Sequence, residues 1–326
     1  MTGPLVSVGV PVFRGTAFVA AALAAIQAQT HPALDVLISV DGADRESAAA
    51  CEPFLADPRF RMVVQERQLG WTDNISFLMR HSAGDYWFYH QQDDHITPDY
   101  VEVLLAHAAG HPEAAVTYCD IQAFGALDRV FSQPPVLGPP AVRAIVLLLA
   151  HFPAVAFRGL ARRSALEVAG DLRTNTFDSF GADTTWMASI ARAGELHRVA
   201  KPLYFKRFHA DSVHSRWVQW PLERRMAAWR VHCRDMLLET VGAGATLVER
   251  RLIFEAALAR VVLAEVARGY IPVEDFTDAD RAAMLEAFLA DIRPRAGEIG
   301  FFLGVPFDVL ADDARRLFAG ARPHTR

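Results

Sequence analysis

Short apolar runs alternate with helix-like stretches over the first 118 residues, and this alternation limits the fold more than any other feature. The runs have the length and the β-branched or aromatic content of buried strands. They are Leu5–Val12, Leu34–Val40, Phe60–Gln65, Tyr86–His90 and Ala115–Tyr118. The stretches with helical apolar spacing are Thr16–Gln29, Arg45–Leu55, Thr72–Ser82 and Pro98–Ala109. Strands and helices that alternate at this spacing predict an α/β fold with a mostly parallel, doubly wound sheet.

The pattern changes in the second half of the chain. It loosens between residues 120 and 180, around the proline-rich stretch SQPPVLGPP, and becomes helical after Pro221. The elements predicted here are a helix over Ala182–Ala193, one or two strands over His197–Phe208, and helices that include Leu252–Val266 and Ala282–Ile292. We therefore expect an α/β domain over residues 1–220 and a helical C-terminal region over residues 221–326.

Charge and cysteine content exclude several classes of protein. A formal net charge of −5 argues against a nucleic-acid binder that relies on a basic surface. The three cysteines are far apart and form no C-x-x-C pair, so neither a disulfide framework nor a zinc motif is predicted. The start of the chain does not resemble a signal peptide, and the longest apolar stretch, Ala144–Phe157, is too short to span a bilayer. We expect a cytoplasmic protein, with peripheral contact to the inner face of a membrane left open.

Polar residues follow three of the predicted strands. They are Pro11-Val12-Phe13-Arg14, Asp41-Gly42-Ala43-Asp44 and Gln91-Gln92-Asp93-Asp94. Ligands of open α/β sheets bind outside the carboxyl ends of the strands, so these segments are expected to line one pocket. Carboxylates on its rim suit a hard divalent cation, and the cation suits a phosphate-bearing ligand. Neither a G-x-G-x-x-G nor a Walker P-loop sequence is present to hold such a ligand by a glycine cradle.

Five segments in order resemble the family 2 glycosyltransferases, which have the GT-A fold. The resemblance runs over roughly residues 5–215. The segments are VSVGVPVFRG, LDVLISVDGADRES, GWTDNISFLMRHSAGDYWFYHQQDD, FGADTTWMASIARAG and YFKRFHADSVHS. Each segment is weak alone, whereas five in the family's order are specific. The resemblance implies a metal-dependent, inverting transfer of a sugar from a nucleotide-sugar to an acceptor hydroxyl.

The resemblance assigns residues to the donor nucleotide. It implies that Asp41 hydrogen bonds the base or ribose and that Arg207 faces the diphosphate. The full set it places at the nucleotide is Pro11, Val12, Arg14, Asp41, Gln91, Gln92 and Arg207. A UDP-sugar is the default donor, with dTDP- and GDP-sugars left open.

The resemblance also assigns the cation and the catalytic base. Asp93 matches the last position of the family's Asp-x-Asp and is expected to bind Mn²⁺ or Mg²⁺, with His209 as a second ligand and His214 as its competitor. Asp183 matches the position of the base that takes the acceptor's proton. Two departures weaken the match: Gln91 stands at the first position of Asp-x-Asp, and Ala182 stands where an acidic residue usually precedes the base.

Alternatives remain at this stage. A nucleotidyltransferase would favour a glycine-rich, basic loop after the first strand, where this chain has only Arg14 and Gly15. A non-catalytic binding or assembly module would account for Gln91 and Ala182. Local roles also compete, since Asp41 suits a turn and Asp183 suits a helix N-cap.

The partners follow from the family and from one aromatic stretch. The expected acceptor is a glycan or a lipid-linked intermediate. The stretch HSRWVQWPLERRMAAWRVH, residues 214–232, mixes tryptophan and arginine. It either meets a membrane or lipid-linked acceptor, or packs the C-terminal helices onto the α/β domain. Those helices are also candidates for a homodimer interface.

Overall fold

The computed structural model describes residues 3–149, 155–208, 217, 219–263 and 275–320. The chain forms two compact units, and each is described by itself. The first unit comprises residues 1–137, 153–174 and 182–210, and the second comprises residues 138–152, 175–181 and 211–326.

The first unit is built on a sheet whose described strands run in the order β3-β2-β1-β4-β8-β6-β9-β5, with β7 paired to β6. The strands are β1 (Val6–Val12), β2 (Leu34–Val40), β3 (Phe60–Val64), β4 (Tyr86–Tyr89), β5 (His95–Ile96), β6 (Ala114–Gly125), β7 (Arg129–Phe131), β8 (Leu160–Arg162) and β9 (Glu195–Phe208). Strands β1 to β4 pair in parallel, as do β6 and β9, whereas β5, β7 and β8 pair antiparallel. The predicted α/β class with a mostly parallel sheet is confirmed.

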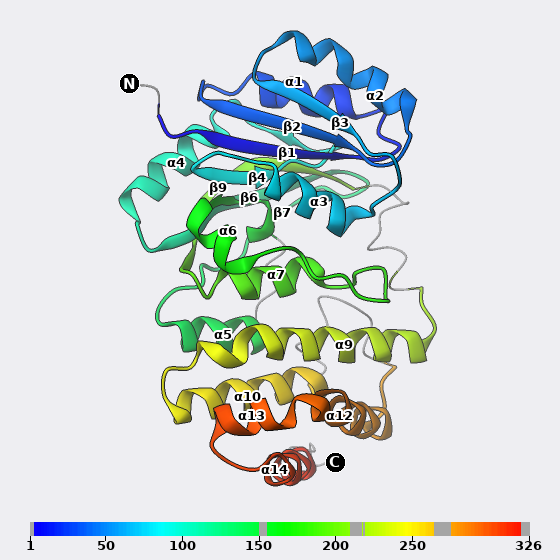
Figure 1. The fold of residues 1–326 in the computed structure, drawn as a ribbon, viewed down its shortest axis with the longest axis vertical. Coiled ribbons are helices and arrows are strands. Elements are labelled where there is room, and N and C mark those ends of the chain that lie inside the picture. Colours follow the sequence, from blue (N-terminus) through cyan, green and yellow to red (C-terminus); the bar gives the residue numbers. More distant parts are fainter. Residues whose placement is uncertain (1–2, 150–154, 209–216, 218, 264–274, 321–326) are drawn as a thin grey trace. The chain divides into compact units, whose positions relative to one another are not determined.

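Helices cover both faces of this sheet. They are α1 (Val19–Gln27), α2 (Arg45–Cys51), α3 (Trp71–Arg80), α4 (Tyr100–Gly110), α6 (Arg163–Ala169) and α7 (Ala182–Ile190). Figure 1 shows α1 and α2 on one side of β1 to β3 and α3 on the other. Because both faces are covered, strand β1 can bury nearly every side chain, and Val6, Val8, Val10 and Val12 are at most 1% exposed.

Strand β6 is longer than the sequence predicted. The expected strand was Ala115–Tyr118, whereas the strand runs from Ala114 to Gly125 and pairs with β9 along its whole length. Asp120 interrupts the apolar run, which made the extension invisible in the sequence. Its carboxylate accepts two hydrogen bonds from Arg198 of β9, at 2.7 and 2.8 Å, so the charge is paired within the sheet.

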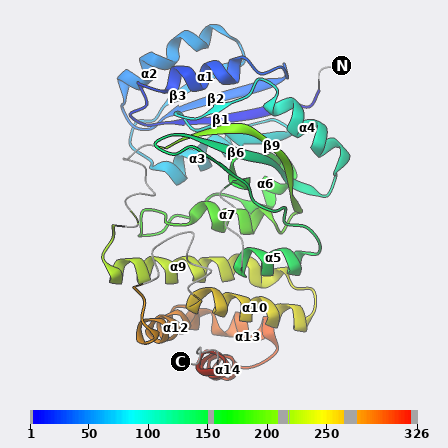
Figure 2. The ribbon, with the colours of Figure 1, turned by 180° about the vertical axis from the view of Figure 1, so that it is seen from behind.

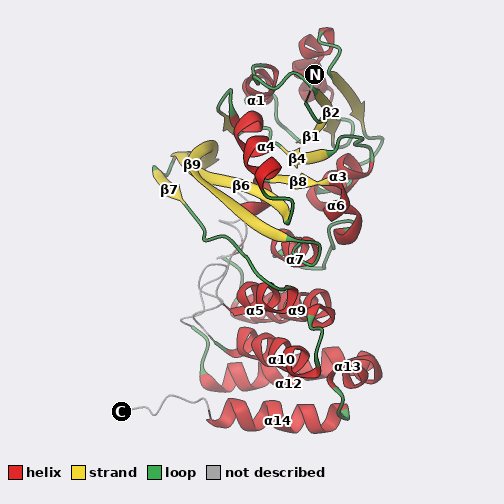
Figure 3. Cartoon of the chain, turned by 90° about the vertical axis from the view of Figure 1, so that its left-hand side faces the viewer, coloured by secondary structure: helices red, strands yellow, loops and turns green. Residues whose placement is uncertain are grey.

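The described elements of the second unit are all helices (Figure 3). They are α5 (Pro140–Leu149), α9 (Leu222–Thr240), α10 (Leu247–Val262), α12 (Asp278–Ile292), α13 (Ala296–Leu303) and α14 (Phe307–Gly320). Two of them begin with a reciprocal capping box, Thr246 with Glu249 at α10 and Thr277 with Asp280 at α12. None of the described helices is both long enough and apolar enough to cross a membrane.

Helix α5 falls in a region where the sequence predicted no element. It contacts α9 and α10, and residues 138–152 group with the C-terminal helices rather than with the sheet. The chain therefore leaves the first unit twice before residue 182, over residues 138–152 and 175–181. These two segments belong to the helical unit together with residues 211–326. The domain boundary predicted near residue 220 stays a prediction.

Candidate active site

Asp41 lies directly after β2 and is 3% exposed. Its carboxylate accepts hydrogen bonds from the backbone N–H groups of Leu69, at 2.6 Å, and Gly70, at 3.0 Å. Its own N–H donates to the carbonyl of Val12 at 2.7 Å. Asp41 thus holds the loop that leads into α3 against the ends of β1 and β2. Each carboxylate oxygen keeps a further acceptor site, so the contact to a nucleobase or ribose stays a prediction.

The segment after β1 curls toward α2. Arg14 has a left-handed backbone, with φ of 49°, and its N–H donates to the carboxylate of Asp44 at 2.7 Å. The Arg14 side chain is exposed, and its guanidinium lies 5.1 Å from the ring centroid of Phe13. Pro11 is half-buried and the side chain of Val12 is fully buried, so Val12 contributes to this loop through its backbone.

The turn after β4 is tied to the same segment. The side-chain oxygen of Gln92 accepts from the N–H of Phe13 at 2.8 Å, and its amide nitrogen donates to the carbonyl of Phe13 at 2.9 Å. Gln91 is half-buried, and its carbonyl accepts the N–H of Asp94 at 3.3 Å to close the turn. Three strand ends, those of β1, β2 and β4, are therefore linked to one another by hydrogen bonds.

Asp94 connects this turn to β9. It is 1% exposed, and its carboxylate accepts from the Tyr204 hydroxyl at 2.8 Å and from the Arg207 N–H at 2.9 Å. Arg158 lies beside it, with Nε 3.6 Å from Oδ2. Burial raises the pKa of Asp94 to about 6. Asp94 was not among the predicted site residues, and its contacts give it a structural role next to Asp93.

Asp93 and Arg207, both predicted site residues, are neighbours. The carbonyl of Asp93 accepts from the Arg207 Nε at 3.3 Å. The Arg207 guanidinium also lies 4.6 Å from the ring centroid of Phe124 and 5.0 Å from that of Phe18. Both side chains are half-buried, so each combines a fixed position with access to solvent.

Asp183 joins these groups from a distant part of the sequence. It lies in the first turn of α7, where its carboxylate accepts the N–H of Thr184 at 2.8 Å. Its negative charge acts on Lys206 together with those of Asp93 and Asp94. Burial, and then the charge of Arg158, lowers the pKa of Lys206 to about 8, and the three carboxylates oppose that shift. The site is thus a mixed cluster of anions and cations near the end of β9.

A divalent cation fits the residues at Asp93. Mg²⁺ and Mn²⁺ prefer oxygen ligands and are commonly held by one or two carboxylates together with substrate phosphates. Among the described residues, no group of three metal-ligating side chains includes Asp93. Asp93 would therefore supply one carboxylate, and the diphosphate of a donor and water would supply further oxygens. The predicted second ligand, His209, and its competitor His214 lie outside the described residues.

Residues 7–166 match the model of glycosyl transferase family 2. This part of the chain belongs to that family. The family and the fold together identify the protein as a glycosyltransferase, as the sequence predicted. A search of curated proteins found no match.

Solved structures share the fold of this glycosyltransferase. The structure of S. aureus TarS 1–349 in complex with UDP-GlcNAc has a TM-score of 0.65 at 12% identity, covering 98% of this chain and 93% of that one. A longer TarS structure has a TM-score of 0.64 at 13% identity, and the match covers 96% of this chain but only 53% of TarS. The mannosyltransferase PcManGT from Pyrobaculum calidifontis, in complex with GDP-Man and Mn²⁺, has a TM-score of 0.55 at 17% identity, covering 98% of this chain and 86% of that one.

The sequence did not predict two cations of the candidate site, Arg158 and Lys206. Arg158 is 9% exposed, and its guanidinium lies 5.9 Å from the Tyr89 ring centroid and 5.7 Å from that of Tyr204. Nothing near Arg158 in the sequence signals this burial, because its partners are far along the chain. Lys206 did carry a signal, since it is one of only two lysines and stands next to Arg207.

Proposed function

We propose that this glycosyltransferase moves a sugar from a nucleoside-diphosphate sugar to a hydroxyl of a glycan or lipid-linked acceptor, with inversion at the anomeric carbon. The observation that carries the proposal is the gathering of Asp93, Asp183, Arg158 and Lys206 in one charged cluster. Carboxylates alone would suit a cation, and cations alone would suit a phosphate. Their combination suits a metal-bound diphosphate that leaves beside a proton acceptor.

Each residue has a distinct task in this proposal. Asp93 holds a divalent cation, which neutralises charge on the departing diphosphate when bound. Arg207 and Lys206 donate to diphosphate oxygens from the β9 side, and Asp41 receives a hydrogen bond from the base or ribose. Asp183 accepts the proton of the acceptor hydroxyl as that oxygen attacks the anomeric carbon. A positioned base of this kind contributes about 10²–10⁴-fold to the rate.

A UDP-sugar is the donor that we test first. TarS, which shares the fold, has a solved complex with UDP-GlcNAc, whereas PcManGT has one with GDP-Man. Both support a nucleotide-sugar donor, and they differ in the base. The polar residues that follow β1 and β2 contact the nucleotide in this proposal, so the base preference resides there.

Calorimetric titration of the protein with UDP, GDP and dTDP, each with Mn²⁺ and with a chelator, tests the proposal. We expect one nucleotide to bind in preference, and to bind with Mn²⁺ but not with the chelator. Asp93→Asn should lose the effect of Mn²⁺, and Asp99→Asn, which changes an exposed aspartate in the next segment, should keep it. Equal binding with and without the cation would contradict the metal role of Asp93, and no binding of any nucleotide would contradict the proposed donor class.

A further inference from the structure

A cluster of three histidines lies at the far end of β9 from the charged site. His107 lies in the last turn of α4, His111 caps the same helix, and His197 lies near the start of β9. Helix α4 lies beside β6 and β9 in Figure 2, and it contacts both strands. His197 and Lys206 pair with Thr117 and Ala123 of β6, which are six residues apart, so at 3.3 Å per residue they are about 20 Å apart along the sheet. The cluster is therefore separate from the proposed donor site.

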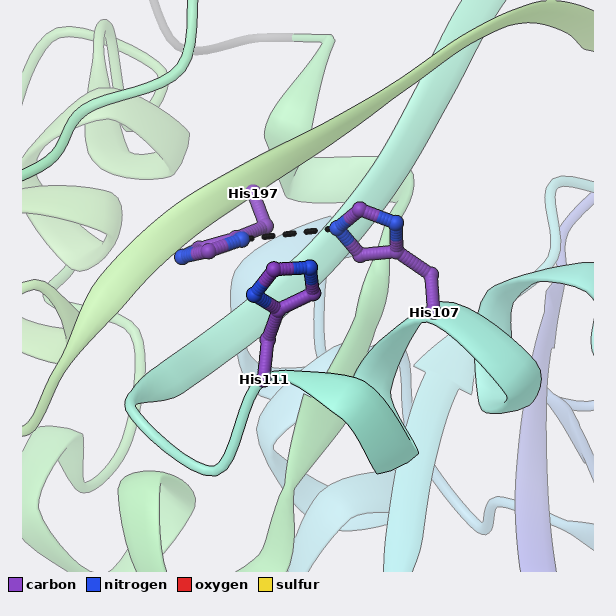
Figure 4. Close-up of side chains that lie close together, drawn as sticks. All are labelled: His107, His111 and His197. Atoms are coloured by element: carbon purple, nitrogen blue, oxygen red, sulfur yellow. Dashed lines mark hydrogen bonds between the residues drawn. The ribbon is translucent and has the colours of Figure 1, made fainter.

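The rings are arranged as a metal site requires. Figure 4 shows ring nitrogens of all three residues turned toward one another. One ligand atom from each lies within 4.8 Å of the others, and His107 Nε2 is 3.4 Å from His197 Nδ1. Nitrogens bound 2.0–2.1 Å from a tetrahedral zinc ion lie roughly 3.3 Å apart, so only small ring movements are needed.

Carboxylates hold the outward nitrogens of two of these rings. Nε2 of His197 lies 2.8 Å from Glu195, and Nδ1 of His111 lies 3.1 Å from Glu113. Each carboxylate accepts an N–H and so leaves the other ring nitrogen, Nδ1 of His197 and Nε2 of His111, with its lone pair for a cation. Metal-bound histidines commonly donate their second N–H to a carboxylate in this way, which fixes the tautomer and the ring orientation.

His197 is 8% exposed, whereas His107 and His111 are partly exposed, so an ion has a route to the site from solvent.

We propose that His107, His111 and His197 bind a transition-metal ion of the zinc class, which joins the end of α4 to the start of β9. Three neutral imidazoles are ligands for Zn²⁺ rather than for Mg²⁺ or Ca²⁺, which prefer oxygen. Glu113 and Glu195 are positioning residues that orient two of the rings. The ion adds a cross-link within the first unit and plays no part in the transfer step.

Untagged, full-length protein stripped with a chelator and titrated with Zn²⁺ against a chromophoric zinc chelator tests this site. We expect a single tightly bound zinc ion and a higher thermal unfolding midpoint when it binds. The variant His107→Ala/His111→Ala should lose both effects. Glu195→Ala should weaken zinc binding by about 10–100-fold, because it removes the acceptor that orients His197. Co²⁺ should give the intense visible absorption of a tetrahedral site in the wild type and not in the double variant.

Matched controls separate this site from others. His81→Ala removes an exposed histidine outside the cluster and should bind zinc as the wild type does. Asp93→Asn should also bind zinc normally, because the cluster is remote from the donor site. Unchanged zinc uptake in the double variant, or no uptake by the wild type, would overturn the proposal. If the double variant does not fold, His111→Ala decides the question, since its side chain is 41% exposed.

Discussion

Gln92 binds both backbone polar groups of Phe13 through its side-chain amide. The side-chain oxygen accepts from the Phe13 N–H at 2.8 Å, and the side-chain nitrogen donates to the Phe13 carbonyl at 2.9 Å. This pair of hydrogen bonds has the pattern of the backbone pairing between neighbouring strands. The contact joins the turn after β4, which carries Asp93, to the segment after β1, which carries Arg14. Sequence comparison assigned Gln92 to the nucleotide, whereas the structure gives its polar atoms to the protein backbone. An effect of Gln92 on donor binding is therefore expected to be indirect.

We predict that Gln92→Ala weakens donor binding without removing a ligand contact. The loss of two hydrogen bonds of about 0.5–1.5 kcal/mol each should release the Phe13 loop. Nucleotide affinity should fall by at most about 150-fold, which corresponds to about 3 kcal/mol. Calorimetry of the preferred nucleotide would measure this loss. If affinity is unchanged while the variant is folded, the two loops do not need to be joined for donor binding.

Gly15→Ala should reproduce the effect of Gln92→Ala. A Cβ atom at Gly15 would lie 2.3 Å from the side-chain oxygen of Gln92, so the amide would have to leave Phe13. Gly110→Ala is the matched control, because a Cβ atom there meets nothing within 4 Å. The two glycine variants should differ in nucleotide affinity. Combining Gly15→Ala with Gln92→Ala should add little, since both remove the same contact.

Lys206 gives donor binding a dependence on pH. Burial lowers the pKa of Lys206 to about 8, so the unbound protein loses this positive charge as pH rises through that value. A bound diphosphate favours the charged form, so the pKa is higher in the complex. Above pH 8, affinity should therefore fall by up to about tenfold per pH unit until the pKa of the complex is reached.

Two variants isolate this effect of Lys206 from other titrations. Lys206→Arg keeps the charge above pH 8, so the added fall in affinity should disappear. Lys201→Arg changes the chain's other lysine, which is exposed, and should behave as the wild type does. Nucleotide affinity measured across this pH range provides the comparison. Identical profiles for all three proteins would show that Lys206 does not contact the diphosphate.

The sequence predicted those parts of the fold whose information is local. Strand β2 has the predicted bounds, Leu34–Val40, because a strand buried on both faces must be apolar along its length. Strand β8 has only three residues and depends on pairing with β4 and β6, so its own sequence carries no periodic pattern. Helix α5 was missed because it follows the proline-rich stretch, whose prolines indicated a loop.

The prediction of the site was also limited, because it depends on contacts between residues that are far apart in the sequence. Polar residues at three strand ends could be expected to meet, and hydrogen bonds do connect them. Which of the adjacent Asp93 and Asp94 is buried depends on Tyr204 and on the backbone of Arg207, more than 100 residues later. No spacing rule contains that information. The histidine cluster was missed likewise, because only α4 shows an i, i+4 pair and the third ring comes from β9.

Arg260 should be essential to the helical unit. It is 0% exposed, and Nη1 donates to the carbonyl of Leu148 at 2.9 Å, while Nη2 lies 2.9 Å from Nε2 of His232. Burial, and then the charge of Arg260, lowers the pKa of His232, so its ring is neutral and accepts the bond. Arg260→Met leaves these buried acceptors without a donor, at a cost of about 1–3 kcal/mol each.

Urea unfolding would measure the effect of Arg260→Met as a lower midpoint. Arg293→Met is the control, because Arg293 is 60% exposed in a surface ion pair with Asp308 and should change stability by less than about 1 kcal/mol.

A deletion of residues 221–326 should destabilise the protein more than Arg260→Met does. It removes α10 from α5, whose Ala144, Leu147 and Leu148 are at most 4% exposed, so the remaining fragment should aggregate. A soluble and active fragment 1–220 would contradict this.

Asp183→Asn should abolish sugar transfer and leave donor binding nearly intact. The carboxylate lies in the first turn of α7, whereas the residues assigned to the nucleotide lie at the ends of β1, β2, β4 and β9. An amide of the same shape can still hydrogen bond an acceptor hydroxyl but cannot take its proton. Turnover should therefore fall by about 10²–10⁴-fold.

Transfer rate and donor affinity, measured on the same Asp183→Asn preparation, separate a base from the alternatives. Asp171→Asn is the matched control, because Asp171 is exposed and pairs with Arg80 at the surface. Near-normal transfer by Asp183→Asn would exclude this residue as the base. Lost donor binding would instead place Asp183 at the nucleotide, where its charge also acts on Lys206. Intact binding with lost transfer, together with a normal Asp171→Asn variant, is the result that a catalytic base requires, because only the proton-transfer step then depends on the carboxylate.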